Sequence, residues 1–182
     1  ELADQMHAIA HEEIKKRHSK ITKKELEQRS EAIGMAAIKF YMLKYDTLQD
    51  FTYDPQESIS FEGETGPYLQ YTYARLCSIL RKQYLKDQKI DYALYDAAEQ
   101  ELIKTLGQFP EIIEEAGRQY KPHLLARYLL DLGQAVNSYY TSHVVLQEDK
   151  QLEKARLALV VAVRMVLGNG LRLLGIMPLE EM

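Results

Sequence analysis

Tryptophan is absent from this sequence of 182 residues, and cysteine occurs only once, at Cys77. A single cysteine excludes a disulfide within the chain and is typical of proteins from a reducing compartment. No apolar run is long enough to span a bilayer, and the first residues lack the cationic and then apolar pattern of a secretion signal. These absences predict a cytoplasmic protein with no membrane partner. Because the chain begins at Glu1 and not at a methionine, we expect it to be a piece of a longer protein.

An excess of positive charge is also absent. The formal net charge is −4, so the total gives no indication of nucleic-acid binding, although local patches attract phosphate more than totals do. Cations gather in two stretches, which are Lys15, Lys16, Arg17, Lys20, Lys23 and Lys24, and then Arg81, Lys82, Lys86 and Lys89. On charge alone, both stretches are interpreted as solvated helix faces.

The sequence does contain apolar residues at spacings of three and four positions, which are typical of amphipathic helices. Two helices are expected within residues 1–45, and Thr22 with Glu25 forms the capping box that starts the second. Further helices are expected from Pro67, over 91–107 and 111–119, from Pro122, and over 148–174 with Gly175 as the stop. Since no strand pattern is convincing, the predicted fold is an all-α helical bundle.

The helical periods also predict which side chains are buried. The helix over 91–107 is expected to bury Leu94, Ala98, Leu102 and Leu106. The helix from Pro122 is expected to bury Leu125, Tyr128, Leu129, Leu132, Val136 and Tyr139. Residues 46–66 are the least regular part of the chain, and Ile59 with Phe61 is expected to form a short extended piece there.

Tyrosine is unusually common, with thirteen residues against four phenylalanines. Tyr71 and Arg75 are four positions apart on one predicted helix, and RNA bases stack on aromatic rings and on guanidinium groups. The alternative is that Tyr68 and Tyr139 are core aromatics with their hydroxyls at the rim. Because neighbours on a helix point about 100° apart, Tyr139 is expected inside and Tyr140 outside, with its ring free to meet a base.

Two histidines raise the question of a metal site. His7 and His11 are four positions apart, so they share one face of a predicted helix. A zinc site needs three or four ligands, and the nearby Glu12 and Glu13 point elsewhere. A metal hydrolase built on these histidines is therefore a remote alternative, and neither a metal site nor a catalytic residue is predicted.

Residues 61–75, which are FEGETGPYLQYTYAR, closely resemble the signature at the junction between the catalytic and anticodon-binding regions of arginyl-tRNA synthetases. Residues 32–40, AIGMAAIKF, are similar to that family's Val-Gly-Ile-Gly-Ala-Val-Lys-Tyr segment. Shorter matches follow in the family's order, at residues 121–123, 128–129, 139–140, 145–146, 155–157 and 173–176. The end of the chain resembles the family's Glu-Arg-Met, except that Glu181 replaces the arginine.

The resemblance implies the C-terminal part of an arginyl-tRNA synthetase, with the helical, DALR-type anticodon-binding domain of class I synthetases. Residues 1–60 would connect to a catalytic domain outside this chain, and residues 61–182 would form the anticodon-binding bundle. The family attaches arginine to its tRNA with ATP, so tRNA(Arg) and the catalytic domain are the implied partners of a monomer. ATP, L-arginine and Mg²⁺ would be used by the catalytic domain, and this chain alone is expected to be inactive and to need no cofactor.

The family's anticodon contacts can be placed on matching positions of this sequence. They imply that Tyr71, Arg75, Tyr140 and Met182 contact the anticodon loop, with Tyr68 and Gln70 as further candidates. The substitution at Glu181 puts in doubt a basic contact at the C-terminal end. The alternative function is a structural or regulatory helical module that keeps the fold and has lost RNA binding.

Overall fold

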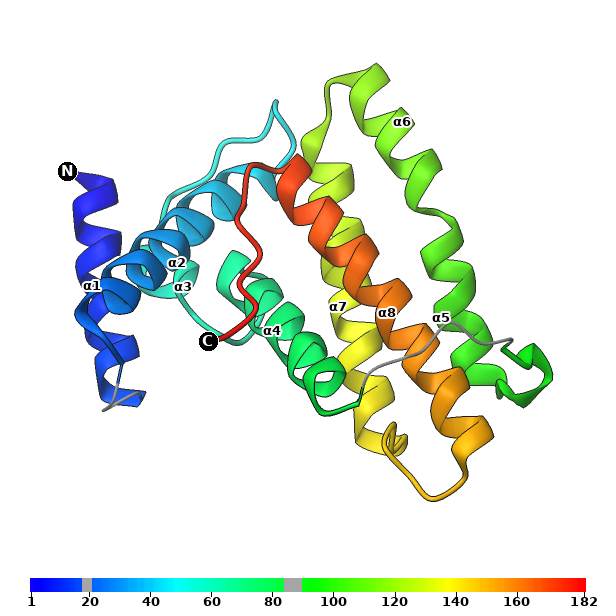
Figure 1. Cartoon of the computed structure of the whole chain (residues 1–182). Helices are drawn as coiled ribbons and strands as arrows, with labels where there is room; N and C mark the ends of the chain where they lie inside the picture. The colour runs from blue at the N-terminus through cyan, green and yellow to red at the C-terminus, as the bar shows by residue number, and fades with distance from the viewer. Residues whose placement is uncertain (18–20, 84–89) are drawn as a thin grey trace.

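The structure, a computed structural model, describes residues 1–17, 21–83 and 90–182, and no β-strand occurs among them. Lys20, Lys86 and Lys89 of the two cationic stretches lie outside the described residues. Helices α1 (Leu2–Arg17) and α2 (Lys23–Leu43) lie at one end of the molecule, and α5 (Ala97–Gly107) and α6 (Phe109–Gln119) lie at the other (Figure 1). Between them are α4 (Gly66–Lys82), α7 (Pro122–Ser142) and α8 (Lys150–Leu173). The all-α fold predicted from the helical periods is confirmed.

Helix α2 joins two hydrophobic clusters. Ile33 and Ala37 pack with Met6 of α1 in the smaller cluster, whereas Ala36 and Phe40 belong to the larger cluster, which α4, α5, α7 and α8 share. The predicted capping box starts α2, because Thr22 Oγ1 accepts from Glu25 N and the Glu25 carboxylate accepts from Thr22 N. A well-capped helix therefore contributes side chains to both clusters and connects the two ends of the molecule.

Helix α4 begins as the sequence predicts and is pressed closely against α2. Thr65 is the N-cap, since its Oγ1 accepts from Tyr68 N at 3.1 Å, and Pro67 occupies the first turn. A Cβ at Gly66 would collide with the carbonyl of Ala36 in α2. Only glycine allows this approach, which fixes where the start of α4 sits on α2.

The core of the large cluster follows the predicted helix faces. All six side chains expected to be buried on α7 are buried, and so is Leu102 on α5. Helix α8 ends at Leu173, and Gly175 follows with a left-handed φ of 69°. Among the described residues, no helix is both long and apolar enough to cross a membrane.

Three details of the sequence prediction were wrong. The helix expected over 91–107 is divided into a 3₁₀ turn, η1 (Tyr92–Leu94), and α5, and Asp96 caps α5. Within the first turn of α5, Ala98 is exposed and Glu99 is buried instead, because Tyr139 and Arg156 supply partners for the Glu99 carboxylate. Ile59 and Phe61 form no extended piece, because Asp54 and Pro55 start a one-turn helix, α3 (Pro55–Ser58), whose C-cap is Ile59.

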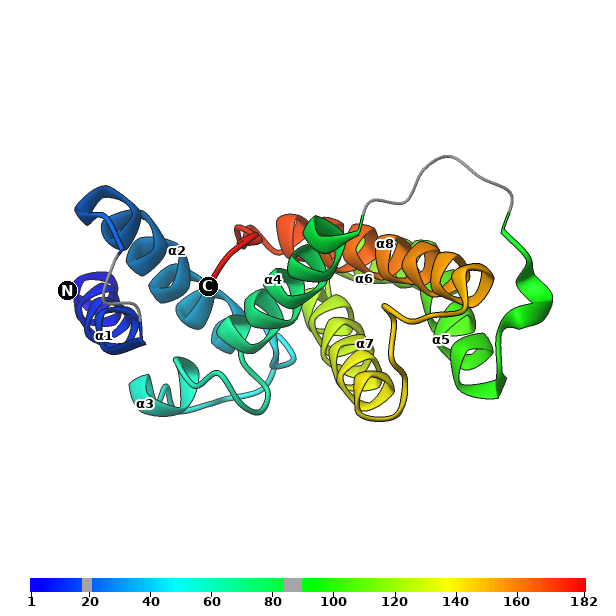
Figure 2. The same ribbon diagram turned by 60° about the horizontal axis from the view of Figure 1, so that its bottom comes forward.

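Residues 175–182, which we call the C-terminal tail, leave α8 as irregular chain and run back between α2 and α4 (Figures 1 and 2). The turn that starts the tail is a Schellman motif, in which Ile176 N donates to Leu171 O and Gly175 N donates to Arg172 O. The buried Ile176 side chain anchors this turn in the core. This turn directs the tail back toward α4, and Met182 at its end lines a pocket with Tyr71.

Candidate functional site

The exposed side of α4 carries two of the predicted site residues. Tyr71 and Arg75 are one helical turn apart and both are exposed, with 46% of Tyr71 accessible to solvent. Residues four positions apart on a helix lie on the same face. A planar aromatic ring and a planar cation are therefore presented side by side, as the spacing predicted.

Arg75 also reaches across to α7. Its guanidinium carbon lies 5.2 Å from the centroid of the Tyr140 ring, which is within the range of a cation–π contact. Tyr140 is half-buried and packs against the large cluster, and this burial raises the pKa of its phenol while Arg75 lowers it. The expectation that the Tyr140 ring is free was wrong, because Arg75 and the core already contact part of the ring.

Tyr68 lies on the side of α4 that faces α7. Its hydroxyl accepts a hydrogen bond from Asn137 Nδ2 at 2.8 Å, and the same nitrogen donates to Thr72 Oγ1 at 3.2 Å. Tyr68 is half-buried. Asn137 was not found from the sequence, because a lone asparagine within a predicted helix gives no local signal. The asparagine joins the α4 and α7 parts of the site.

Tyr71 and Met182 meet in a small pocket of about 130 Å³, although they lie far apart in the sequence. The other lining residues are Glu13, Ile14, Arg29, Ile33 and Phe61. Met182 is half-buried and packs against the small hydrophobic cluster. The pocket lining is mostly apolar and includes the charged Glu13 and Arg29, a mixture that suits a flat ligand with polar edges.

Gln70 does not lie on the exposed side with Tyr71 and Arg75. Its side chain is fully buried, and Nε2 donates to Met177 O at 2.7 Å and to Ala32 O at 3.3 Å. A ligand at the surface of α4 cannot reach this carboxamide. The expectation of a direct contact by Gln70 is therefore not supported by its position.

Glu181, the position at which the chain departs from the family pattern, lies between two arginines. Its carboxylate is 3.2 Å from Arg29 of α2 and 3.7 Å from Arg81 of α4. Arg81 also donates to Glu180 O at 3.0 Å. The end of the tail is thus attached to both helices by charge, and no basic side chain projects from position 181.

The two histidines of α1 contact acidic groups and belong to no cluster of three or more potential metal ligands among the described residues. His7 Nε2 and His11 Nε2 lie 3.2 and 3.8 Å from the two carboxylate oxygens of Glu27 in α2. The half-buried histidines and Glu27 thereby connect α1 to α2. This arrangement gives no support to a hydrolase built on His7 and His11.

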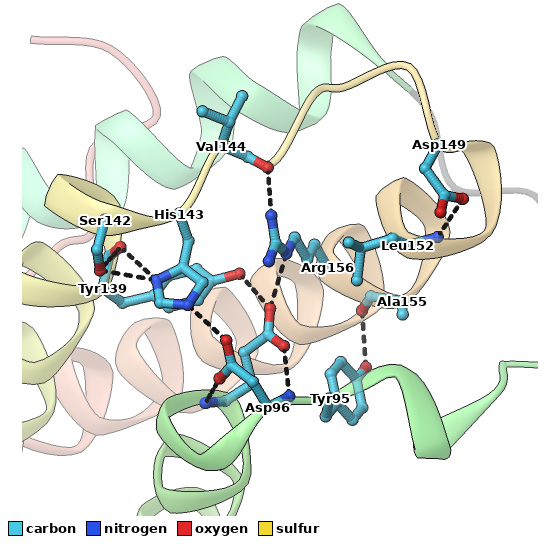
Figure 3. Close-up of polar contacts among 11 residues, drawn as sticks. Tyr95, Asp96, Tyr139, Ser142, His143, Val144, Asp149, Leu152, Ala155 and Arg156 are labelled. Carbon is cyan, nitrogen blue, oxygen red and sulfur yellow. Dashed lines mark hydrogen bonds and ion pairs between the residues drawn. The ribbon is translucent and has the colours of Figure 1, made fainter.

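A different polar cluster lies where α5, α7 and α8 meet (Figure 3). The fully buried Glu99 accepts from Arg156 Nε at 2.8 Å and from Tyr139 Oη at 2.9 Å. His143 Nε2 lies 2.8 Å from Asp96 Oδ2. Hydrogen bonds from the Glu99 amide and from His143 hold the pKa of Asp96 below its usual value.

Asp96, Glu99 and His143 have potential ligand atoms within 4.8 Å of one another, so this cluster has the composition of a metal site. Each carboxylate already has partners within the chain, however. Asp96 Oδ1 accepts from Glu99 N and Glu99 Oε2 accepts from Asp96 N, in the capping box of α5. These contacts explain the cluster as a structural connection between three helices. It could not be predicted from sequence patterns, because its members come from distant segments of the chain.

Comparisons with known proteins agree with the architecture. A model of the DALR anticodon binding domain family matches residues 69–182. An arginine–tRNA ligase of Lactococcus lactis is 43% identical over 158 residues, which covers 86% of this chain and 28% of the relative. One from Thermococcus kodakarensis is 37% identical over 182 residues, covering 95% of this chain and 28% of the relative.

Two solved structures are similar over the whole chain. An arginyl-tRNA synthetase of Thermus thermophilus matches with a TM-score of 0.93 and 33% identity, covering 100% of this chain and 32% of that protein. The enzyme of Plasmodium falciparum matches with a TM-score of 0.89 and 27% identity, covering 100% of this chain and 33% of that protein. The chain spans less than a third of the length of these proteins.

Proposed function

The chain belongs to the DALR anticodon-binding domain family, and from this premise we propose that it binds the anticodon loop of an arginine tRNA. The relatives that match it are arginine–tRNA ligases. In this proposal residues 61–182 hold the anticodon loop, and residues 1–60 connect them to a catalytic domain that attaches arginine to the tRNA with ATP. That domain would use ATP, L-arginine and Mg²⁺, in a monomeric, cytoplasmic enzyme.

One observation carries the proposal. Tyr71 is an exposed ring that lines a pocket with Met182, and the exposed Arg75 lies one turn along the same helix. A splayed RNA base is bound by stacking on such a ring or on a guanidinium group, while its edge meets polar atoms. The pocket offers the ring, a mostly apolar lining, and the charged side chains of Glu13 and Arg29.

The contact between Arg75 and Tyr140 extends this surface toward α7. A guanidinium held against an aromatic ring is already oriented, so it loses less conformational freedom when a base or a phosphate binds. We therefore assign Tyr140 a supporting role, in which its ring places Arg75 and the exposed part of the ring remains open to a base. Asn137 of α7 donates a hydrogen bond to the Tyr68 hydroxyl. We place Tyr68 at the edge of the proposed RNA-binding surface.

The charge of α4 favours an RNA partner even though the net charge of the chain is −4. Arg75, Arg81 and Lys82 are all exposed on this helix. Local groups of cations attract a phosphate backbone more strongly than the total charge indicates. Helix α4 itself carries no acidic residue, and Glu181 of the tail contacts Arg81 and leaves Arg75 and Lys82 as the cations of this surface.

Replacing Tyr71 with alanine is expected to weaken the binding of an arginine-tRNA anticodon stem-loop by about 1–3 kcal/mol, the usual contribution of one base–aromatic stack. Because Tyr71 is half exposed, the thermal midpoint should change little. Fluorescence anisotropy with a labelled stem-loop measures the affinity. Tyr92→Ala is the matched control, since Tyr92 is exposed on η1, outside the proposed surface.

Equal losses of affinity for Tyr71→Ala and Tyr92→Ala would contradict the placement of the site on α4. If the unaltered chain binds no stem-loop at all, the alternative function is favoured, namely a structural or regulatory helical module. The two variants therefore test the site, and the unaltered chain tests the function.

A further inference from the structure

We propose that Gln70 is a positioning residue, whose buried carboxamide holds the C-terminal tail so that Met182 lines the same pocket as Tyr71. The proposal rests on the RNA-binding function proposed above. It assigns Gln70 a role different from the direct contact expected from the sequence, because the side chain is fully buried.

The hydrogen bonds of Gln70 show how it acts on the tail. Nε2 donates one hydrogen bond to Met177 O of the tail and another to Ala32 O of α2. A buried amide is costly unless its polar atoms are paired. Nε2 uses both of its hydrogens on these two carbonyls, whereas the buried Oε1 has no hydrogen-bond partner among the described residues. Met177 lies in irregular chain, where no helical hydrogen bond is available to its carbonyl. The carboxamide therefore connects α2, α4 and the tail at one point.

Gln70 acts in the middle of a tail that is fixed at both ends. At the start, the Schellman turn anchors Ile176, and Lys39 Nζ donates to Gly175 O. At the end, Arg29 and Arg81 hold Glu181. Between these two attachments, Gln70 donates a hydrogen bond to Met177 O. This contact fixes the tail on its path from the end of α8 to the pocket.

The neighbours of Gln70 on α4 explain why its position matters for binding. Tyr71 is the next residue and points into the pocket that Met182 also lines. The same turn of α4 therefore supplies the stacking ring and, through the buried carboxamide, the position of the second wall of the pocket. Binding to a preformed pocket avoids the cost of ordering the tail when the base arrives.

The test is Gln70→Leu, which keeps a buried side chain of similar size and removes both hydrogen bonds. We expect the stem-loop affinity to fall by roughly tenfold, the change that corresponds to losing the one hydrogen bond that reaches the tail, to Met177 O. The ¹³C-methyl resonance of Met182 should shift, and the tail amides should exchange faster with solvent. Ser30→Ala is the control for a buried polar group, since Ser30 Oγ donates only within α2, to Leu26 O.

A second variant separates positioning from a general loss of stability. Deleting residues 177–182 removes both Met182 and the carbonyl that Gln70 holds. If Gln70 acts through the tail, Gln70→Leu should lower the affinity of the full chain and cause no further loss in the shortened chain. An equal loss in both backgrounds would overturn the proposal, and so would an unchanged Met182 resonance in Gln70→Leu.

These outcomes are distinct from a failure of the proposed function. If the unaltered chain does not discriminate between stem-loops, the RNA-binding proposal fails. The Met182 resonance and the exchange of the tail amides are measured without RNA, so they still report whether Gln70 holds the tail.

Discussion

Replacing Glu99 with alanine is expected to lower the free energy of unfolding by about 3–5 kcal/mol, which is the usual cost of removing one partner of a buried ion pair. The Arg156 guanidinium, whose side chain is mostly buried, would lose its partner at 2.8 Å. The Tyr139 hydroxyl would also lose its acceptor. Chemical denaturation followed by circular dichroism measures the change.

The control for this prediction is the double variant Glu99→Ala with Arg156→Met. Removing both charges leaves no unpaired ion in the interior, so the double variant should be clearly more stable than Glu99→Ala alone. A loss below about 1 kcal/mol for Glu99→Ala, which is typical of an exposed ion pair, would contradict the burial of this pair.

Tyr139→Ala is expected to cost about 3–5 kcal/mol of stability, as other large aromatic core residues do. The Tyr139 side chain is buried, and its ring stacks on His143 with 4.4 Å between the ring centroids. Tyr139→Phe keeps the ring and removes only the hydrogen bond to the charged Glu99, so it should cost about 1.5–3 kcal/mol, less than Tyr139→Ala. Thermal and denaturant melts of the two variants separate packing from hydrogen bonding.

Tyr140→Ala is the neighbouring comparison for Tyr139→Ala. Because Tyr140 is half-buried under Arg75, its loss should cost no more than about half of the 1.5–3 kcal/mol that full burial of a large apolar side chain contributes. A Tyr140→Ala variant that melts earlier than Tyr139→Ala would mean that the inner and outer faces of α7 are reversed.

Much of the fold could be predicted from the sequence, because the determining signals are local. The capping box of Thr22 and Glu25, the start of α4 near Pro67 and the buried face of α7 depend on residues within a few positions of one another. The helical period also placed Tyr71 and Arg75 on one face. Each of these features follows from spacings of three or four residues along one helix.

The features that could not be predicted depend on partners far away in the chain. Glu99 is buried because Tyr139 and Arg156 supply its hydrogen bonds, whereas a charged residue in a helical pattern indicates an exposed face. Asp96 with Glu99 is a capping-box pattern that would have given the correct start of α5. This capping box is a local pattern, but the apolar spacing of Leu94 and Ala98 indicated an earlier start for the helix.

In the candidate site, too, some features follow from the sequence and others depend on distant partners. The resemblance supplied Tyr71 and Met182, and the structure brings these two residues together. Gln70 is next to Tyr71 in the sequence, but its side chain is buried and donates to Met177 O of the tail, a partner 107 positions away. The contact of Arg75 with Tyr140 also depends on how α4 and α7 cross, which helical periods do not determine.

The most direct test of the proposed function is whether this chain discriminates between anticodons. Its affinity should be measured by anisotropy for an arginine-tRNA anticodon stem-loop and for one with the same stem and another anticodon. We expect binding of the arginine loop to be at least about tenfold tighter, since one base contact contributes about 1–3 kcal/mol. The logarithm of the association constant should also fall linearly with the logarithm of the salt concentration, with a slope of about −0.7 for each phosphate neutralised on a single strand. Equal affinity for the two loops, or binding that does not depend on salt, would contradict the proposal that the α4 surface recognises an anticodon.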